Sequence, residues 1–205
     1  MCQWVGCPAR MHDYPFDLTI LSALFWLVSA SWIVFELRHN IGHGRAKLRL
    51  RGSAQVPMIA AFGAVCSSAL CYAFDLGLAY PVLERAIVAC VGIALGASGL
   101  ALRFYTARVL GSYFTREITI MDGHRIIRDG PFRYIRHPAY LGSMLTEIGF
   151  TCALGPLYAI AFAAVLCPIA YSIRIRAEED ALVNEFGDDY RNYQRRTRRL
   201  VPFVY

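Results

Sequence analysis

Residues 139–173, AYLGSMLTEIGFTCALGPLYAIAFAAVLCPIAYSI, decide the fold of this chain. They hold two apolar runs, Ala139 to Leu154 and Leu157 to Ile173, with Gly155-Pro156 between them. Glycine commonly follows the end of a helix, and proline commonly occupies the first turn of the next one. The stretch therefore predicts two helices joined as a tight helical hairpin.

Three further apolar runs lie upstream, Leu18 to Phe35, Val56 to Phe74 and Ala86 to Leu102. Each is long enough to cross most or all of the ~30 Å hydrocarbon core of a bilayer as a helix. The last of them carries three glycines, which permit close helix contact in lipid. We therefore expect an all-α integral membrane protein with about five transmembrane helices, the last two forming the hairpin.

The composition favours a membrane protein over a soluble one. Of the 205 residues, 57% are hydrophobic and only 18% are charged, whereas soluble domains carry about 25% charged residues. No internal repeat is visible, so we expect a single membrane domain over residues 1–205. Residues 1–102 would form three N-terminal spans, and residues 103–205 would form a more polar half with spans four and five.

The basic residues gather between the apolar runs. Of the 21 Lys and Arg, all but Arg10 and Arg85 lie in residues 38–51, 103–136 and 174–199. This asymmetry predicts that the N-terminus lies outside and that the C-terminus and its polar segments lie in the cytoplasm. The net charge of +6 is therefore a topology signal, and nucleic acid is not an expected partner.

The cysteines do not predict a metal site. Five of the seven lie within apolar runs, where a thiol behaves as a small hydrophobe. None has a histidine or cysteine partner at zinc spacing, so no metal is expected. The pairing of Cys2 with Cys7 and the oligomeric state stay open.

The polar stretch 103–140, RFYTARVLGSYFTREITIMDGHRIIRDGPFRYIRHPAY, is more than a linker. Asp122-Gly123 and Asp129-Gly130-Pro131 are turn signals. Ile118 to Met121 and Ile126-Ile127 are candidates for short extended pieces around the first turn. The stretch therefore predicts a structured segment between the third and fourth spans.

Arg136 and His137 stand before Pro138, which suits the first position of the fourth transmembrane helix. Positive side chains oppose the dipole at a helix N-terminus unless an anion or a carboxylate lies close. The two residues therefore mark a candidate site for such a group. The alternative is that both are ordinary interfacial charges.

Glu178 and Glu179 follow shortly after the fifth apolar run. Adjacent carboxylates repel each other and are costly near lipid unless they are paired or face a polar cavity. Arg174 shares a helix face with Glu178 because the two are four residues apart. Arg136 and His137 are the other candidate partners. The alternative is a solvated acidic helix face held by intrahelical pairs.

Glu147 lies inside the fourth apolar run, about two helical turns after Tyr140. An ionisable residue at that depth is a functional candidate. The alternative is a structural role, in which the carboxylate binds a Ser or Tyr hydroxyl on a neighbouring helix.

The C-terminal half of the chain resembles the isoprenylcysteine carboxyl methyltransferase family in the order and spacing of a set of residues. The set comprises Arg103, Leu110-Gly111, Phe114-Thr115, His124, Gly130-Pro131-Phe132, Arg136-His137-Pro138-x-Tyr140, Gly142, Arg174, Glu178-Glu179, Leu182, Phe186-Gly187, Tyr190, Tyr193 and Pro202. The resemblance implies a helical membrane fold and S-adenosylmethionine as the cofactor. It also implies a cofactor pocket that is built by the C-terminal, catalytic half and open to the cytosol.

The resemblance further implies roles for single residues. Arg174 and Glu178 would be the catalytic residues, with Arg174 holding the carboxylate of the acceptor. Glu147 departs from the mostly apolar pattern expected there and is a candidate substrate residue. The residues implied to bind the cofactor are His124, Gly130, Pro131, Arg136, His137, Pro138, Tyr140, Glu178 and Glu179.

The implied reaction is in-line transfer of a methyl group to the carboxylate of a lipophilic, isoprenylcysteine-like acceptor, either a small molecule or a prenylated protein, in contact with membrane lipid. One alternative is a methyltransferase that acts on an amine, a thiol or a phospholipid headgroup. The other is a membrane sterol or enone reductase that uses NADPH, because such enzymes have a similar helical half and an Arg-His-Pro stretch.

Overall fold

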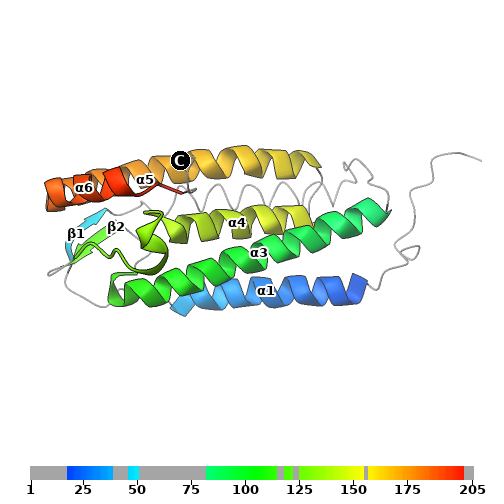
Figure 1. Ribbon diagram of the computed structural model, residues 1–205. Coiled ribbons are helices and arrows are strands. Elements are labelled where there is room, and N and C mark those ends of the chain that lie inside the picture. The colour runs from blue at the N-terminus through cyan, green and yellow to red at the C-terminus, as the bar shows by residue number, and fades with distance from the viewer. Residues whose placement is uncertain are drawn as a thin grey trace, which may run out of the picture.

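The computed structural model describes residues 18–38, 46–50, 82–114, 118–121, 125–154 and 157–200. Its long helices are α1 (Leu18–Arg38), α3 (Val82–Leu110), α4 (Pro138–Leu154) and α5 (Leu157–Phe186). In space, α3 packs between α1 and α4, and α4 packs against α5 (Figure 1). The short helix α6 (Asp188–Arg196) follows α5 at one end of this bundle.

These four long helices occupy the positions of predicted spans one, three, four and five. The predicted second span, Val56 to Phe74, lies outside the described residues, so the count of five stays a prediction. Two stretches in the described part, Ala86–Tyr113 and Ala159–Phe186, are long and apolar enough to cross a membrane, and an 18-residue segment of each has a mean hydropathy of 1.9 and 1.5, respectively. The long elements therefore agree with a helical membrane protein.

Helices α4 and α5 are the two arms of the predicted hairpin. Helix α4 begins at Pro138, as the His-Pro step predicts, and Gly155-Pro156 between the arms lies outside the described residues. Helix α5 continues beyond its apolar run to Phe186, so Glu178 and Glu179 are on the same helix as that run. The arms share a buried core of Met144, Ala163, Cys167, Tyr171 and Ile175.

Helices α3 and α4 approach each other through glycines. A Cβ atom on Gly99 would lie 2.5 Å from the carbonyl oxygen of Gly142, and one on Gly92 would lie 2.6 Å from that of Gly149. Side chains at these positions would force the two helices apart. The prediction that the glycine-bearing run makes a close helix contact is therefore confirmed, and its partner is α4.

A small sheet departs from the all-α prediction. Strand β1 (Ala46–Leu50) pairs antiparallel with strand β2 (Ile118–Met121), and Leu50 is paired with Ile118. The extended piece predicted at Ile118 to Met121 is confirmed, but its partner is the link after α1 and not Ile126-Ile127. Strands this short alternate too few times to stand out from a loop, so the sequence pattern does not reveal the pairing.

Candidate active site at the end of the helical hairpin

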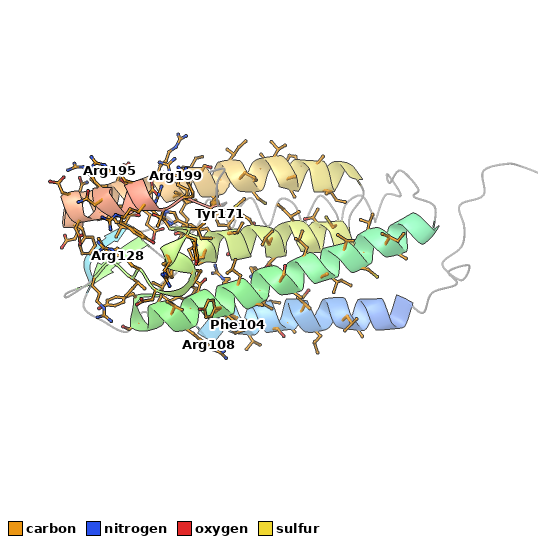
Figure 2. All side chains as sticks on the ribbon, viewed as in Figure 1. Phe104, Arg108, Arg128, Tyr171, Arg195 and Arg199 are labelled. Atoms are coloured by element: carbon orange, nitrogen blue, oxygen red, sulfur yellow. The ribbon has the colours of Figure 1, made fainter. Side chains whose placement is uncertain are left out.

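Four of the candidate residues lie close together near the end of α5. Arg136 and His137 stand just before α4, and Glu178 and Glu179 lie in the last part of α5. Because the hairpin brings the start of α4 beside the end of α5, Arg136 reaches Glu179 across 43 residues of sequence. Figure 2 shows that arginines from other segments, among them Arg199, gather at the same end of the bundle.

Glu179 is the centre of the buried part of this site. Its side chain is 4% exposed, and its Oε1 accepts a hydrogen bond from Arg136 Nε at 2.7 Å and lies 3.2 Å from His137 Nε2. Its Oε2 accepts a hydrogen bond from Arg199 Nε at 3.0 Å. A buried carboxylate is stable only when charged or polar donors surround it. The predicted partners Arg136 and His137 are confirmed, and Arg199 is a third that sequence reasoning did not single out.

The side chain of Arg136 also caps the C-terminal end of helix α6. Its Nη1 donates to the carbonyl oxygens of Gln194, at 3.1 Å, and Thr197. The last carbonyls of a helix have no partner within the helix, and the helix dipole makes that end negative, so a cation there is stabilising. One buried guanidinium therefore holds together the start of α4, the end of α5 and the end of α6.

The segment after α6 runs back along the entry to α4. The backbone N–H of Arg136 donates to the carbonyl of Arg198 at 2.7 Å, and that of His137 donates to the carbonyl of Arg199 at 3.0 Å. Leu200 then enters the core between α4 and α5. We call residues 197–200 the C-terminal strap, because they tie the last helix to the residues that face Glu179.

Tyr140 organises the more open part of the site. Its hydroxyl donates to Glu178 Oε2 at 2.6 Å and accepts a hydrogen bond from Arg174 Nε at 2.7 Å. Its ring is stacked on that of His137, with ring centres 5.6 Å apart and planes 10° apart. Arg174 and Glu178 are thus joined through Tyr140, whereas the sequence alone predicted only that they share a helix face.

The two glutamates differ in exposure. The side chain of Glu178 is 28% exposed, and that of Glu179 is 4% exposed. His137 lies near both, with its Nδ1 3.8 Å from Glu178 Oε2. Glu179 is therefore engaged by protein groups, and Glu178 is the carboxylate of the pair that faces outward.

Gly130 and Pro131 form the start of a short 3-10 helix, η2 (Gly130–Arg133). Gly130 has a φ of +57°, a conformation that other residues rarely adopt. Tyr193 of α6 donates its hydroxyl to the carbonyl of Phe132 at 2.7 Å, and burial raises the pKa of Tyr193 to about 12. The predicted Gly-Pro turn is thus confirmed and attached to α6. His124 lies outside the described residues.

Glu147 does not join the cluster around Glu178 and Glu179. Its Oε1 accepts a hydrogen bond from the hydroxyl of Tyr171 at 2.7 Å, and its Oε2 accepts one from Cys167 Sγ at 3.4 Å. Both partners are on α5. The structural alternative, a hydroxyl partner on a neighbouring helix, is therefore what the geometry favours, and Tyr171 is a residue that the sequence pattern did not single out.

The fold has a counterpart among solved structures. A structure titled the eukaryotic intramembrane Ras methyltransferase ICMT aligns with a TM-score of 0.65 at 21% sequence identity, covering 90% of this chain and 68% of that one. The fold is thus that of an intramembrane methyltransferase. Residues 90–184 match the isoprenylcysteine carboxyl methyltransferase family. The chain is thus similar to this family over the matched segment, which contains every predicted site residue.

Relatives of known name agree with this family. A probable protein-S-isoprenylcysteine O-methyltransferase from Oryza sativa subsp. indica is 28% identical over 187 residues, which are 87% of this chain and 96% of that protein. Protein-S-isoprenylcysteine O-methyltransferase B from Arabidopsis thaliana is 34% identical over 116 residues, 55% of this chain and 58% of that protein. The chain is therefore an enzyme of the membrane methyltransferase class.

Proposed function

We propose that this protein transfers a methyl group from S-adenosylmethionine to the carboxylate of a lipophilic, isoprenylcysteine-like acceptor. The observation that carries the proposal is the bridge from Arg174 through Tyr140 to Glu178, within the segment matched by the family. In this bridge the guanidinium of Arg174, which is suited to the carboxylate of the acceptor, lies near the carboxylate of Glu178, which is suited to the positively charged cofactor. The names of the relatives support the same acceptor class.

The residues at this site fit the chemistry of the cofactor. Glu178, the more exposed carboxylate, is suited to the ammonium or the ribose hydroxyls of the cofactor. When bound, the cofactor supplies an electrophilic methyl group on a sulfonium. We assign its binding to His124, Gly130, Pro131, Arg136, His137, Pro138, Tyr140, Glu178 and Glu179.

Arg174 is the residue that we assign to the acceptor. A guanidinium holds a carboxylate with two parallel hydrogen bonds, and Tyr140 fixes the orientation of this one through Nε. A carboxylate is already ionised at neutral pH, so the reaction requires no general base. The protein's task is therefore to align the acceptor oxygen with the methyl group and to exclude water.

We place the site on the cytoplasmic side of the membrane and the N-terminus on the other side. The clustering of basic residues in the segments that build the site supports this orientation. A lipophilic acceptor would then enter sideways from the bilayer, with its chain among the helices and its carboxylate at Arg174. A free small molecule and a prenylated protein both fit this description.

The test uses the full-length protein in detergent or lipid nanodiscs, with labelled S-adenosylmethionine and N-acetyl-S-farnesylcysteine. We expect a base-labile methyl ester on the acid and no product from the matching carboxamide. Methylation of an amine, thiol or phospholipid instead would overturn the assignment of the acceptor. Calorimetric binding of NADPH without binding of S-adenosylhomocysteine would overturn the methyltransferase assignment altogether.

The pH dependence separates a carboxylate acceptor from an amine acceptor. An amine must lose a proton before it attacks, so its methylation rate falls steeply on the acid side of neutral. A carboxylate is ionised throughout that range. We therefore expect a flat rate profile through neutral pH.

A further inference from the structure

Polar side chains link α4 to each of its two packed neighbours, α3 and α5, next to the site. Arg103 on α3 donates from Nη1 to the hydroxyl of Ser143 on α4, and that hydroxyl donates to the carbonyl of Ala139 at 3.1 Å. Tyr171 on α5 donates its hydroxyl to Glu147, also on α4, at 2.7 Å. Polar side chains of α4 thus make hydrogen bonds to both neighbouring helices, α3 and α5.

Arg103 and Glu147 are each held by further contacts. The guanidinium of Arg103 lies over the rings of Phe35 and Phe114, with its central carbon 5.6 Å and 5.4 Å from their centres. Glu147 receives a second hydrogen bond from Cys167. A charge among transmembrane helices is costly, and hydrogen bonds donated to it offset part of that cost. Glu147 is therefore a fixed acceptor for Tyr171 and not a loose polar group.

Tyr171 is connected to the site through an aromatic contact. The ring centres of Tyr171 and Tyr140 are 5.6 Å apart, with an angle of 43° between their planes. Tyr140 and Glu147 are seven residues apart on α4, and Tyr171 and Arg174 are three apart on α5, so all four lie along the interface of the hairpin. The position of the Tyr171 ring therefore limits where the Tyr140 ring can lie.

We propose that Glu147 is a positioning residue for methyl transfer: by holding Tyr171 it fixes Tyr140, and through the Tyr140 hydroxyl it fixes the guanidinium of Arg174. The inference rests on the proposed function, which gives Arg174 its role toward the acceptor. Glu147 itself does not touch the reacting groups. An error of about 1 Å in the placement of a reacting group can cost about 100-fold in rate, so a distant support of this kind has a measurable effect.

The first test compares two substitutions of the same residue. Glu147→Ala removes the oxygen that accepts from Tyr171, and Glu147→Gln keeps an oxygen at that place. We expect Glu147→Ala to lower kcat about tenfold and Glu147→Gln to lower it no more than about threefold. The matched control is Cys167→Ala, which removes the hydrogen bond from Cys167 to the carboxylate and leaves kcat within about twofold. Full activity of Glu147→Ala would overturn the proposal.

The second test asks whether the effect passes through Tyr140. In a double-mutant cycle, Glu147→Ala is combined with Tyr140→Phe, which lacks the hydroxyl that holds Arg174. We expect the tenfold effect of Glu147→Ala on kcat to shrink to less than about twofold in that background. An equal loss in both backgrounds would mean a general structural defect and would overturn the proposal. If Glu147→Ala does not fold, Tyr171→Phe keeps the ring and enters the same cycle.

A readout without catalysis separates this proposal from the proposed function. Fluorotyrosine placed at position 140 gives a ¹⁹F resonance in the protein without cofactor or acceptor. We expect that resonance to move in Glu147→Ala and to stay near its wild-type position in Glu147→Gln and Cys167→Ala. An unmoved resonance in Glu147→Ala rejects the positioning role even if wild-type protein methylates the acceptor. A moved resonance supports it even if no acceptor is methylated.

Discussion

Tyr140 and Arg174 are joined in two ways. Arg174 Nε donates to the phenolic oxygen at 2.7 Å, and the guanidinium carbon lies 5.2 Å from the centre of the tyrosine ring. Each residue comes from a different arm of the hairpin, so the packing of α4 against α5 sets the direction of the arginine. The same phenol donates to Glu178. Tyr140 therefore holds both Arg174, proposed to bind the acceptor, and Glu178, proposed to bind the cofactor.

Removal of the Tyr140 hydroxyl should therefore impair both the positioning of the acceptor and the binding of the cofactor. In Tyr140→Phe the ring remains, but Arg174 and Glu178 lose their shared partner. We expect at least a tenfold fall in kcat and a weaker affinity for S-adenosylhomocysteine, on the order of threefold. Steady-state kinetics and calorimetry measure the two effects. A loss in only one of them would contradict the shared support.

Glu178 and Arg174 should separate in the same assays. We expect Glu178→Ala to weaken the binding of S-adenosylhomocysteine, because it removes the outward-facing carboxylate. Arg174→Ala should mostly lower turnover and leave the affinity for S-adenosylhomocysteine near that of the wild type. Equal losses of affinity in the two variants would reject this division of roles.

Arg136 should matter for stability more than any exposed arginine. Arg136→Ala removes one partner of the buried Glu179 and the donor to the carbonyls at the end of α6, and breaking a buried ion pair costs about 3–5 kcal/mol. The control is Arg128→Ala, which removes an ion pair with Asp189 whose side chains are 50% and 66% exposed, and exposed pairs contribute about 0–1 kcal/mol. Thermal unfolding in detergent measures both. Similar midpoints for the two variants would contradict a structural role for Arg136.

The glycine contact between α3 and α4 predicts a strong size limit at Gly99. Gly99→Leu would push a side chain into the backbone of Gly142, and overpacking of this kind costs about 1–3 kcal/mol or more. Ala97→Leu on the exposed side of the same helix should have little effect, since that side chain has room. Folded yield and the unfolding midpoint report the difference. Tolerance of leucine at both positions would mean that the helices are not in close contact.

Tyr193 should contribute stability that is lost in alkali. Its pKa is raised by burial from 10.0 to about 12, so the neutral phenol is favoured in the folded state. Its contribution is therefore complete below pH 10 and is lost as the pH rises from about 10 through 12. Absorbance of phenolate measures the titration, and Tyr193→Phe provides the control without this group. A normal midpoint for Tyr193 would contradict its burial.

The sequence was sufficient for the hairpin and for half of the site. Gly155-Pro156 and Pro138 are local signals, and they predict where α4 and α5 begin. The cost of adjacent carboxylates near lipid predicts that Glu178 and Glu179 need partners, and it points to Arg136 and His137. Helix-ending residues and paired carboxylates have these properties in any tertiary structure, so they can be recognised in the sequence alone.

The partners from distant segments were not predictable in the same way. Arg199 reaches Glu179 only because the C-terminal strap turns back along the residues that precede α4. The spacing of residues in the sequence does not predict such a turn. In the sequence, Tyr171 looks like any other aromatic residue of an apolar run. Only its hydrogen bond to Glu147 in the structure distinguishes it. Strand β1 has too few residues to show a period. Each of these contacts depends on tertiary packing and not on local pattern.

The C-terminal strap also imposes an order on biosynthesis. The N–H groups of Arg136 and His137 find their acceptors on Arg198 and Arg199, so this end of the protein cannot close while those residues are still inside the ribosome. The membrane helices can insert one by one as they emerge, but the site must be assembled afterwards. A nascent chain halted before Thr197 would therefore reside in the membrane with this end of the helical bundle unfinished.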